Sequence, residues 1–341
     1  MTEPTLILIG LIVVFALFFD FVNGFHDAAN SIATIVATGV LKPLHAVMWA
    51  AFFNFAAVFV FDTDVAKTVG SGMINLNYVT LPVILAGLIG ATAWGLITWW
   101  FKMPSSSSHA LIGGYAGAAI THHGMHQGWI NAQEVIITSG WSKVILFIIL
   151  APVIGLALGG TLMKLTKLLP KRSNKWFGRL QLLSSAFLSL THGGNDAQKT
   201  AGILTGALVT AGAIDHFTIP HWVLFISYGT MALGTLAGGW RIVDTMGRQL
   251  TRLQPSSGFC AETAAASSIL LATLLKLPVS TTHITTGAIL GTGAAREIKA
   301  VRWNLAGRIL MAWTITIPAA ALLSGVMLLA LQMLLAPQWI T

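Results

Sequence analysis

Hydrophobic residues run along this chain in long blocks, without the strict alternation of polar and apolar positions that half-buried strands show. Seven blocks are candidates for the helices of roughly 20 residues that cross a membrane. They cover residues 6–19, 44–61, 81–101, 144–163, 223–240, 259–275 and 309–335, and the last is long enough to contain a break near Pro318. Because Gly, Ala and Leu dominate, the pattern predicts a helical bundle rather than a β-barrel.

The composition supports this interpretation. Hydrophobic residues make up 55% of the chain and charged residues only 9%, whereas a soluble domain carries about 25% charged residues. We therefore expect an integral membrane protein. The first apolar block has no basic residue before it, so we read it as a membrane helix rather than a cleaved signal. The single cysteine, Cys260, lies in an apolar setting and is expected to pack.

The net charge of +8 could suggest a nucleic-acid partner, but much of it is concentrated in one short segment. Its basic residues are Lys164, Lys167, Lys171, Arg172, Lys175 and Arg179. A basic loop between membrane helices is typical of the cytoplasmic side, where it meets anionic lipid headgroups. The charge therefore indicates a lipid bilayer as the partner and no nucleic acid.

Two polar sequence motifs, called phrases below, occur twice and in the same order. Residues 23–31 are matched by residues 192–200, 169 positions later, and the Ser-rich phrase 104–109 is matched by 278–283. The order predicts a duplicated unit, with a first repeat at 1–163, a basic loop at 164–179 and a second repeat at 180–341. An outside start and an inside loop require an odd number of crossings, which makes the repeats inverted.

The repeated phrases are poor lipid-facing helices because they are polar or interrupted by glycine. The segments are 24–40 and 104–120 in the first repeat, and 193–208 and 278–293 in the second. Irregular backbone at membrane depth must be buried in protein or line a wet cavity. We predict an all-α membrane bundle of two inverted-topology repeats, with broken or re-entrant helices that meet near the midplane.

Each repeat places a carboxylate within a polar stripe. Asp27, Asn30 and Ser31 share one helix face, and Asp196, Lys199 and Thr200 repeat the spacing. Charged groups inside a membrane are costly and usually functional. The alternative is that these side chains only form hydrogen bonds between packed helices. The presence of the same cluster in both repeats favours a functional role.

The second phrase predicts helices that start near Pro104 and Pro278. Such starts offer free N–H groups, and the neighbouring hydroxyls add donors, which together suit a tetrahedral oxyanion. Ordinary N-capping by Ser and Thr is the alternative. An oxyanion between Asp27 and Asp196 needs compensating positive charge from Na⁺, from protons or from a fixed cation.

These motifs, their order and their duplication resemble the inorganic phosphate transporter (PiT) family over essentially the whole chain. The resemblance implies a symporter, commonly dimeric, that binds phosphate between two inverted repeats. His26 and Lys199 stand where sodium-coupled members have amides. The chain therefore resembles the low-affinity bacterial branch, which is thought to be proton-coupled and to carry metal–phosphate complexes. This resemblance implies a multi-pass protein of the bacterial inner (plasma) membrane.

The resulting hypothesis is that a homodimer takes up inorganic phosphate, alone or as a metal–phosphate complex, together with protons. Expected phosphate-binding residues are Asn30, Ser31, Ser105, Ser106, Ser107, Ser108, Asn195, Thr200, Ser280, Thr281 and Thr282. Expected coupling or charge-compensating residues are His26, Asp27, Asp196 and Lys199. We interpret Lys199 as a tethered counter-ion, because an ammonium has no acceptor with which to ligate Na⁺, and His26 as the titratable partner.

Three alternatives stay open: sodium coupling, sulfate or another tetrahedral oxyanion as cargo, and an anion channel. No nucleophile–base pair or spaced metal motif stands out, so we expect no enzyme, no cofactor and no resident metal. We place His122, His123 and His126 in a solvated loop. Glu262 either pairs with a basic residue or lines the cavity.

Overall fold

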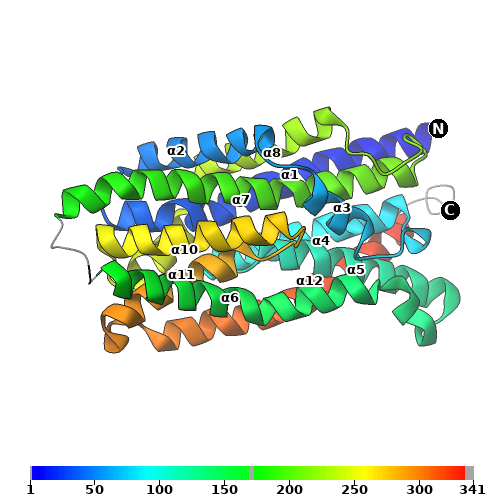
Figure 1. The fold of residues 1–341 in the computed structure, drawn as a ribbon. Coiled ribbons are helices and arrows are strands. Elements are labelled where there is room, and N and C mark those ends of the chain that lie inside the picture. Colours follow the sequence, from blue (N-terminus) through cyan, green and yellow to red (C-terminus); the bar gives the residue numbers. More distant parts are fainter. Residues whose placement is uncertain (1, 167, 169–172, 335–341) are drawn as a thin grey trace.

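The computed structural model describes residues 2–166, 168 and 173–334, and within these ranges the chain is helical (Figure 1). The first repeat contains α1 (Glu3–Ala37), α2 (Pro43–Ala56), η1 (Ala57–Phe59), α3 (Asp64–Ser71), η2 (Leu76–Tyr78), α4 (Leu81–Trp100), α5 (Ser107–Gln127), η3 (Trp129–Val135) and α6 (Thr138–Thr166). The second contains α7 (Asn174–Thr210), α8 (His221–Ala237), α9 (Trp240–Asp244), η4 (Thr245–Gln249), α10 (Pro255–Leu274), α11 (Thr281–Arg296), η5 (Ile298–Ala300) and α12 (Trp303–Leu334). Six principal helices thus recur in the same order, which confirms the duplication.

Five described helices are long and apolar enough to cross a membrane, and two bent pairs can add a crossing each. The pairs are α2/η1 with α3, bent by 86°, and α8 with α9/η4, bent by 63°. The first repeat crosses with α1, the bent pair α2/η1–α3 and α6, and the second with α7, the bent pair α8–α9/η4 and α12. The apolar helices α4 and α10 instead turn back with α5 and α11, so each repeat makes three crossings. The second repeat is therefore inverted relative to the first, as the sequence predicts.

The remaining helices of each repeat form re-entrant hairpins, α4–α5 and α10–α11. Their tips contain the two non-glycine residues with positive φ in the described chain, Lys102 and Lys276, at 59° and 60°. Each tip rests on the broken span of the other repeat. Thr245 Oγ1 donates to the Lys102 carbonyl at 3.1 Å, and Thr68 Oγ1 donates to the Lys276 carbonyl at the same distance. The prediction of re-entrant segments at 104–120 and 278–293 is confirmed.

The prediction of broken or re-entrant helices in segments 24–40 and 193–208 is wrong. Both segments are the second halves of long continuous helices, α1 of 35 residues and α7 of 37. Their polar side chains are buried against other helices, so the backbone can stay helical without presenting polar groups to lipid. The break expected near Pro318 is also absent, because α12 continues through it.

Each hairpin packs on the final span of the opposite repeat through small residues. Gly113 on α5 faces α12 so closely that an added Cβ would lie 2.7 Å from the Ile317 carbonyl oxygen. In the other half, an added Cβ at Gly159 on α6 would lie 2.5 Å from the Ala288 carbonyl oxygen on α11. Close backbone approach of this kind stabilises helix pairs in membranes, and here it interlocks the two repeats.

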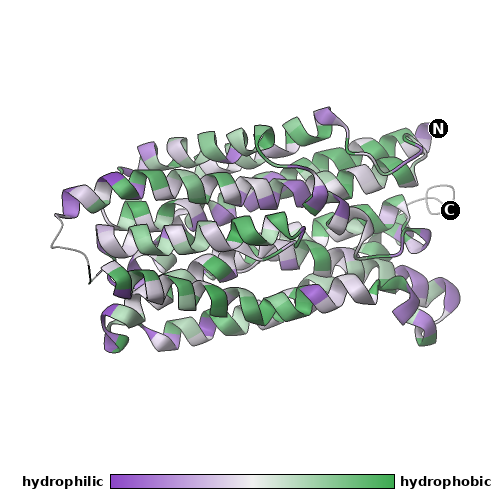
Figure 2. Cartoon of the chain, viewed as in Figure 1, coloured by the Kyte–Doolittle hydropathy of each residue, from purple (hydrophilic) through white to green (hydrophobic). Residues whose placement is uncertain are grey.

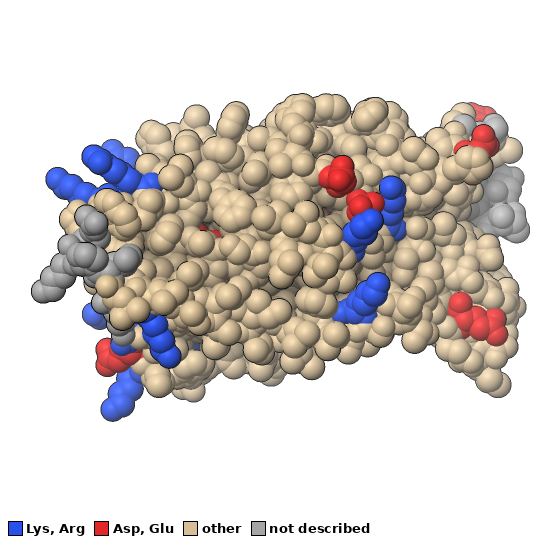
Figure 3. Space-filling model, viewed as in Figure 1, with Lys and Arg blue, Asp and Glu red and all other residues tan. Residues whose placement is uncertain are grey.

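The charge distribution marks the membrane boundaries. On α6, Lys143 and Lys164 bracket 20 residues without charge, about 30 Å of helix and so about one hydrocarbon thickness. Green ribbon dominates the long outer helices between the two ends in Figure 2. Lys and Arg gather at the left end of Figure 3, where α6 ends and α7 begins. The start of α1 and the end of α12 lie at the other end.

The predicted basic loop is only partly described. Lys167, Lys171 and Arg172 lie outside the described residues. Because α6 ends at Thr166 and α7 begins at Asn174, the segment 164–179 includes the first turns of α7. The boundaries 1–163, 164–179 and 180–341 remain a prediction.

The arrangement predicts which residues face which side of the membrane. A cysteine at Ser173, the exposed N-cap of α7, should react with an impermeant maleimide only from the cytoplasmic side. A cysteine at Gln127, the exposed end of α5, should react from outside. The native Cys260 is buried and should give little background. Labelling of Ser173→Cys in intact cells would overturn this orientation.

Candidate functional site

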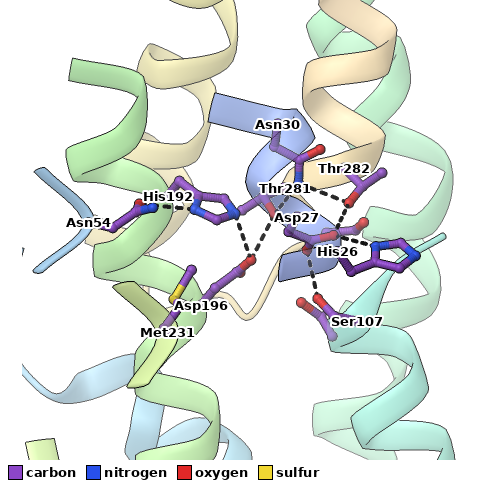
Figure 4. A network of polar contacts seen from close by, with 12 residues as sticks. His26, Asp27, Asn30, Asn54, Ser107, His192, Asp196, Met231, Thr281 and Thr282 are labelled. Carbon is purple, nitrogen blue, oxygen red and sulfur yellow. Dashed lines mark hydrogen bonds and ion pairs between the residues drawn. The ribbon is translucent and has the colours of Figure 1, made fainter. Parts of the chain in front are cut away.

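The two hairpins bring the starts of α5 and α11 against the middles of α1 and α7, where the two aspartates lie (Figure 4). Asp27 accepts a hydrogen bond from Ser107 Oγ at 2.8 Å, and Thr282 Oγ1 lies 3.4 Å from its other oxygen. His26 Nδ1 is 2.9 Å from the same Asp27 Oδ1 atom. Asp27 is therefore contacted by groups from both repeats.

Asp196 occupies the matching position in the second repeat. Thr281 Oγ1 donates to it at 2.9 Å, as Ser107 does to Asp27. Lys199 Nζ lies 2.5 Å from the other carboxylate oxygen, and His192 Nε2 lies 3.3 Å from the first. All four side chains are buried. The second aspartate is thus held by a fixed cation, whereas no lysine or arginine of the described chain pairs with the first.

The equivalent residues Asn30 and Lys199 both reach across to the other repeat. Asn30 Nδ2 donates to Thr282 Oγ1 at 3.0 Å, and Lys199 Nζ donates to Ser108 Oγ at 2.5 Å. Ser108 and Thr282 are themselves equivalent, so the approximate two-fold symmetry extends to individual hydrogen bonds. The contacts tie each motif to the helix start of the opposite repeat.

The Ser and Thr residues of the hairpins divide into two groups. Ser106 Oγ accepts from the His109 backbone N–H at 3.1 Å, and Ser280 Oγ accepts from that of His283 at 3.2 Å. These two are N-caps, so for them the capping interpretation fits. The helices start at Ser107 and Thr281, three residues later than predicted, because the prolines belong to extended segments.

Other predicted site residues lie at the edge of this cluster. Ser105 Oγ contacts Thr98 Oγ1 at 3.3 Å, and Asn195 Nδ2 donates to Thr273 Oγ1 at 2.9 Å. His26 Nε2 is 3.2 Å from Thr98 Oγ1 on α4, much as Asn195 contacts Thr273 on α10. His26 and Asn195 therefore clamp the first helix of their own hairpin. Ser31 Oγ and Thr200 Oγ1 are buried without a hydrogen-bond partner among the described residues.

His192 was missed from the sequence. One ligand atom each from Asp27, His192 and Asp196 lies within 4.8 Å of the others. Oxygen and imidazole donors at this spacing could bind a cation. The available signal was the place of His192 in the second motif, four residues before Asp196 and thus on the same helix face.

Two side predictions need correction. Glu262 has no basic partner among the described residues: it accepts hydrogen bonds from Thr34 Oγ1, Gln181 Nε2 and Ser184 Oγ at 2.6, 2.8 and 2.5 Å. It is buried where α10 meets α1 and α7. The histidines expected in a loop instead belong to the last turns of α5, and they are His122, His123 and His126.

Comparison with known proteins agrees with this geometry. The sequence profile of the phosphate transporter family matches residues 23–324. A probable low-affinity inorganic phosphate transporter of Rhizobium meliloti is 51% identical, over 94% of this chain and 95% of that protein. One of Bacillus subtilis is 44% identical, over 96% and 98%. This chain belongs to the phosphate transporter family.

One solved structure has a similar fold. The structure titled the sodium-dependent phosphate transporter superposes with a TM-score of 0.86, covering 96% of this chain and 100% of that one. At 23% sequence identity, the likeness establishes the fold alone. It supports the inverted-repeat architecture of this phosphate transporter family member independently of its motifs.

The ion pair between Lys199 and Asp196 should be important for stability. Lys199→Met should lower the free energy of unfolding by about 3–5 kcal/mol, because it leaves a buried carboxylate without its ammonium. The double variant Lys199→Met/Asp196→Asn should recover most of that loss. Thermal unfolding in detergent measures both.

The exposed pair Lys67–Asp64, 3.5 Å apart, supplies the matched control. Lys67→Met should change the free energy of unfolding by about 1 kcal/mol or less, since solvent screens that pair. Equal destabilisation by Lys199→Met and Lys67→Met would contradict the importance assigned to the buried pair.

Proposed function

We propose that this protein carries inorganic phosphate across the bacterial inner membrane by symport with protons. The observation that carries the proposal is the meeting of two repeat-related helix starts, each with hydroxyl donors, around Asp27 and Asp196 (Figure 4). Helix N-termini and hydroxyls suit an oxyanion. The names of the Rhizobium and Bacillus relatives agree with phosphate as the cargo.

The charges at the site support coupling to a cation. Two carboxylates face this region, and Lys199 is bonded to only one of them. Bringing in an anion therefore requires further positive charge. The ammonium fills the position equivalent to Asn30, where it can neutralise Asp196 but cannot ligate Na⁺. We therefore favour protons over sodium as the coupling ion.

Hydrogen phosphate fits this site better than sulfate. It carries a proton that needs an acceptor, and Asp27 or Asp196 can supply one. Sulfate lacks that proton at neutral pH. A metal–phosphate complex is compatible with the group formed by Asp27, His192 and Asp196, because its metal could use those donors.

Transport also requires movement of the hairpins. The described cavity beside Asn23, His26 and Ser107 has a volume of about 10 Å³, about enough for one water molecule. Phosphate can reach the aspartates only when the starts of α5 and α11 separate from α1 and α7. Such alternating exposure distinguishes a carrier from the anion channel kept as the alternative, and the homodimer stays a prediction.

Uptake into proteoliposomes tests cargo and coupling together. An inward proton gradient should drive labelled phosphate above equilibrium, whereas a sodium gradient alone should not. Unlabelled sulfate should compete poorly. Uphill uptake that depends strictly on Na⁺ would refute proton coupling, and downhill flux without any gradient-driven accumulation would favour a channel.

The two groups of hydroxyls should behave differently. Ser107→Ala removes a donor at Asp27 and should weaken phosphate binding by about 1–3 kcal/mol. Ser106→Ala removes the N-cap and should instead lower the free energy of unfolding by about 0.5–2 kcal/mol. Phosphate binding and thermal unfolding, measured on both variants, separate the roles. Unchanged binding in Ser107→Ala/Thr281→Ala would exclude these hydroxyls from the site.

A further inference from the structure

A second buried carboxylate lies on α1 outside the cluster around Asp27. Asp20 is completely buried, and neither of its oxygens has a hydrogen-bond partner among the described residues. It lies seven residues before Asp27, so it shares that helix face at a distance of about 10 Å along the axis. Asp20 is therefore beside the phosphate site, displaced towards the end of the bundle where α1 starts.

The polar side chains that face Asp20 come from two other helices. They are Thr200 on α7 and Ser227 on α8. Both hydroxyls are buried and, like the carboxylate, lack a hydrogen-bond partner within the described part of the chain. Thr200 and Ser227 thus lie close enough to interact with Asp20, but none of the three groups makes a hydrogen bond of normal geometry, whereas buried polar groups in proteins are normally paired.

Within residues 2–166, 168 and 173–334, no cationic side chain forms an ion pair with Asp20. On the helices packed against α1, the titratable groups that act on Asp20 are Asp196 on α7 and Tyr228 on α8. Asp196 has the same sign of charge, and its own ammonium partner is Lys199. An ionised carboxylate without a partner is very costly inside a membrane bundle. The site is therefore favourable only when Asp20 holds a cation.

We propose that Asp20 is the carrier of the coupling proton, in a pocket completed by Thr200 and Ser227. The inference deepens the proposed symport and rests on it. A hydroxyl both donates and accepts, so these two side chains can accompany the carboxylate and the carboxylic acid alike. One carboxylate and two hydroxyls provide too few oxygens to replace the hydration shell of Na⁺.

The position of Asp20 links its proton to the anion. Thr200 lies one turn after Asp196, so the proton pocket and the phosphate site share α7 as well as α1. A negative charge added about 10 Å away raises the proton affinity of a carboxylate by about tenfold at the effective dielectric of proteins. Because linkage is reciprocal, the proton must strengthen phosphate binding by the same factor.

Asp20 also differs from His26, the titratable group proposed from the sequence. Both ring nitrogens of His26 have polar neighbours, Asp27 and Thr98. Its equivalent, Asn195, makes the corresponding contact to the hairpin without any titratable proton. This favours a positioning role for His26. Asp20, in contrast, is a titratable group whose oxygens make no hydrogen bond to the described residues and are free to take up a proton.

The second repeat supplies a matched control. The position equivalent to Asp20 is Ser189 on α7, which is also buried and bonds to the Ser185 carbonyl at 2.8 Å. Ser189→Ala removes a buried polar group at the same depth by symmetry but leaves the proton pocket intact. Its uptake should keep the pH dependence of the unmutated protein.

The experiment uses full-length protein in proteoliposomes, with external pH fixed so that the protonation of external phosphate does not change. Only the internal pH is varied. For one proton per phosphate, each unit of pH difference supports about tenfold accumulation. Asp20→Asn should lose this accumulation but continue to exchange external labelled phosphate for internal unlabelled phosphate.

The outcomes separate the two levels of inference. No phosphate uptake by the unmutated protein contradicts the proposed function itself. Accumulation by Asp20→Asn that still follows the pH difference, or its loss in His26→Asn alone, overturns the role of Asp20. Sodium-driven accumulation that disappears in Asp20→Asn overturns the proton as its ligand. If Asp20→Asn does not fold, Ser227→Ala serves: it should shift the pH of half-maximal exchange, and an unchanged profile contradicts the pocket.

Discussion

The structure depends on how two carboxylates are kept in the middle of a membrane bundle. Asp27 and Asp196 are buried, and such charges are tolerated only when hydrogen bonds and opposite charge compensate them. The starts of α5 and α11 provide donors at this depth, and the re-entrant hairpins bring these helix starts there. The hairpins in turn need the broken spans α3 and α9/η4, whose Thr68 and Thr245 hold the tips. The buried charges thus account for both unusual elements of each repeat.

The same symmetry makes the one charge difference informative. Asn30 and Lys199 make equivalent contacts across the repeats, to Thr282 and Ser108. A neutral amide leaves Asp27 without a lysine, whereas the ammonium neutralises Asp196. Phosphate bound as we propose would therefore meet two similar sets of hydroxyls but an unequal electrostatic environment. This inequality is the physical basis for assigning cation coupling to the first repeat, which also contains Asp20.

The sequence predicted features that are repeated, and it failed where a role depends on tertiary contacts. Duplicated motifs predicted the two repeats and the re-entrant hairpins, and the basic segment between the repeats predicted that they are inverted. They could not show that α1 and α7 continue through their motifs, because that depends on which helices bury the polar side chains. Ser106 and Ser107 are adjacent and chemically identical, yet one caps α5 and the other binds Asp27. Local sequence cannot distinguish these roles, nor could it find the partners of Glu262.

The packing of the hairpins constrains how the site can open. Each hairpin belongs to one repeat by sequence, but its second helix packs on the other: α5 on α12, and α11 on α6, with backbones in close contact at Gly113 and Gly159. A hairpin that moves with its close-packed partner span must slide past the motif helix of its own repeat. Such a movement would break the hydrogen bonds from Ser107 to Asp27 and from Thr281 to Asp196. The hydrogen bonds that an incoming anion would replace are thus the same ones that hold the site closed, which ties opening to binding.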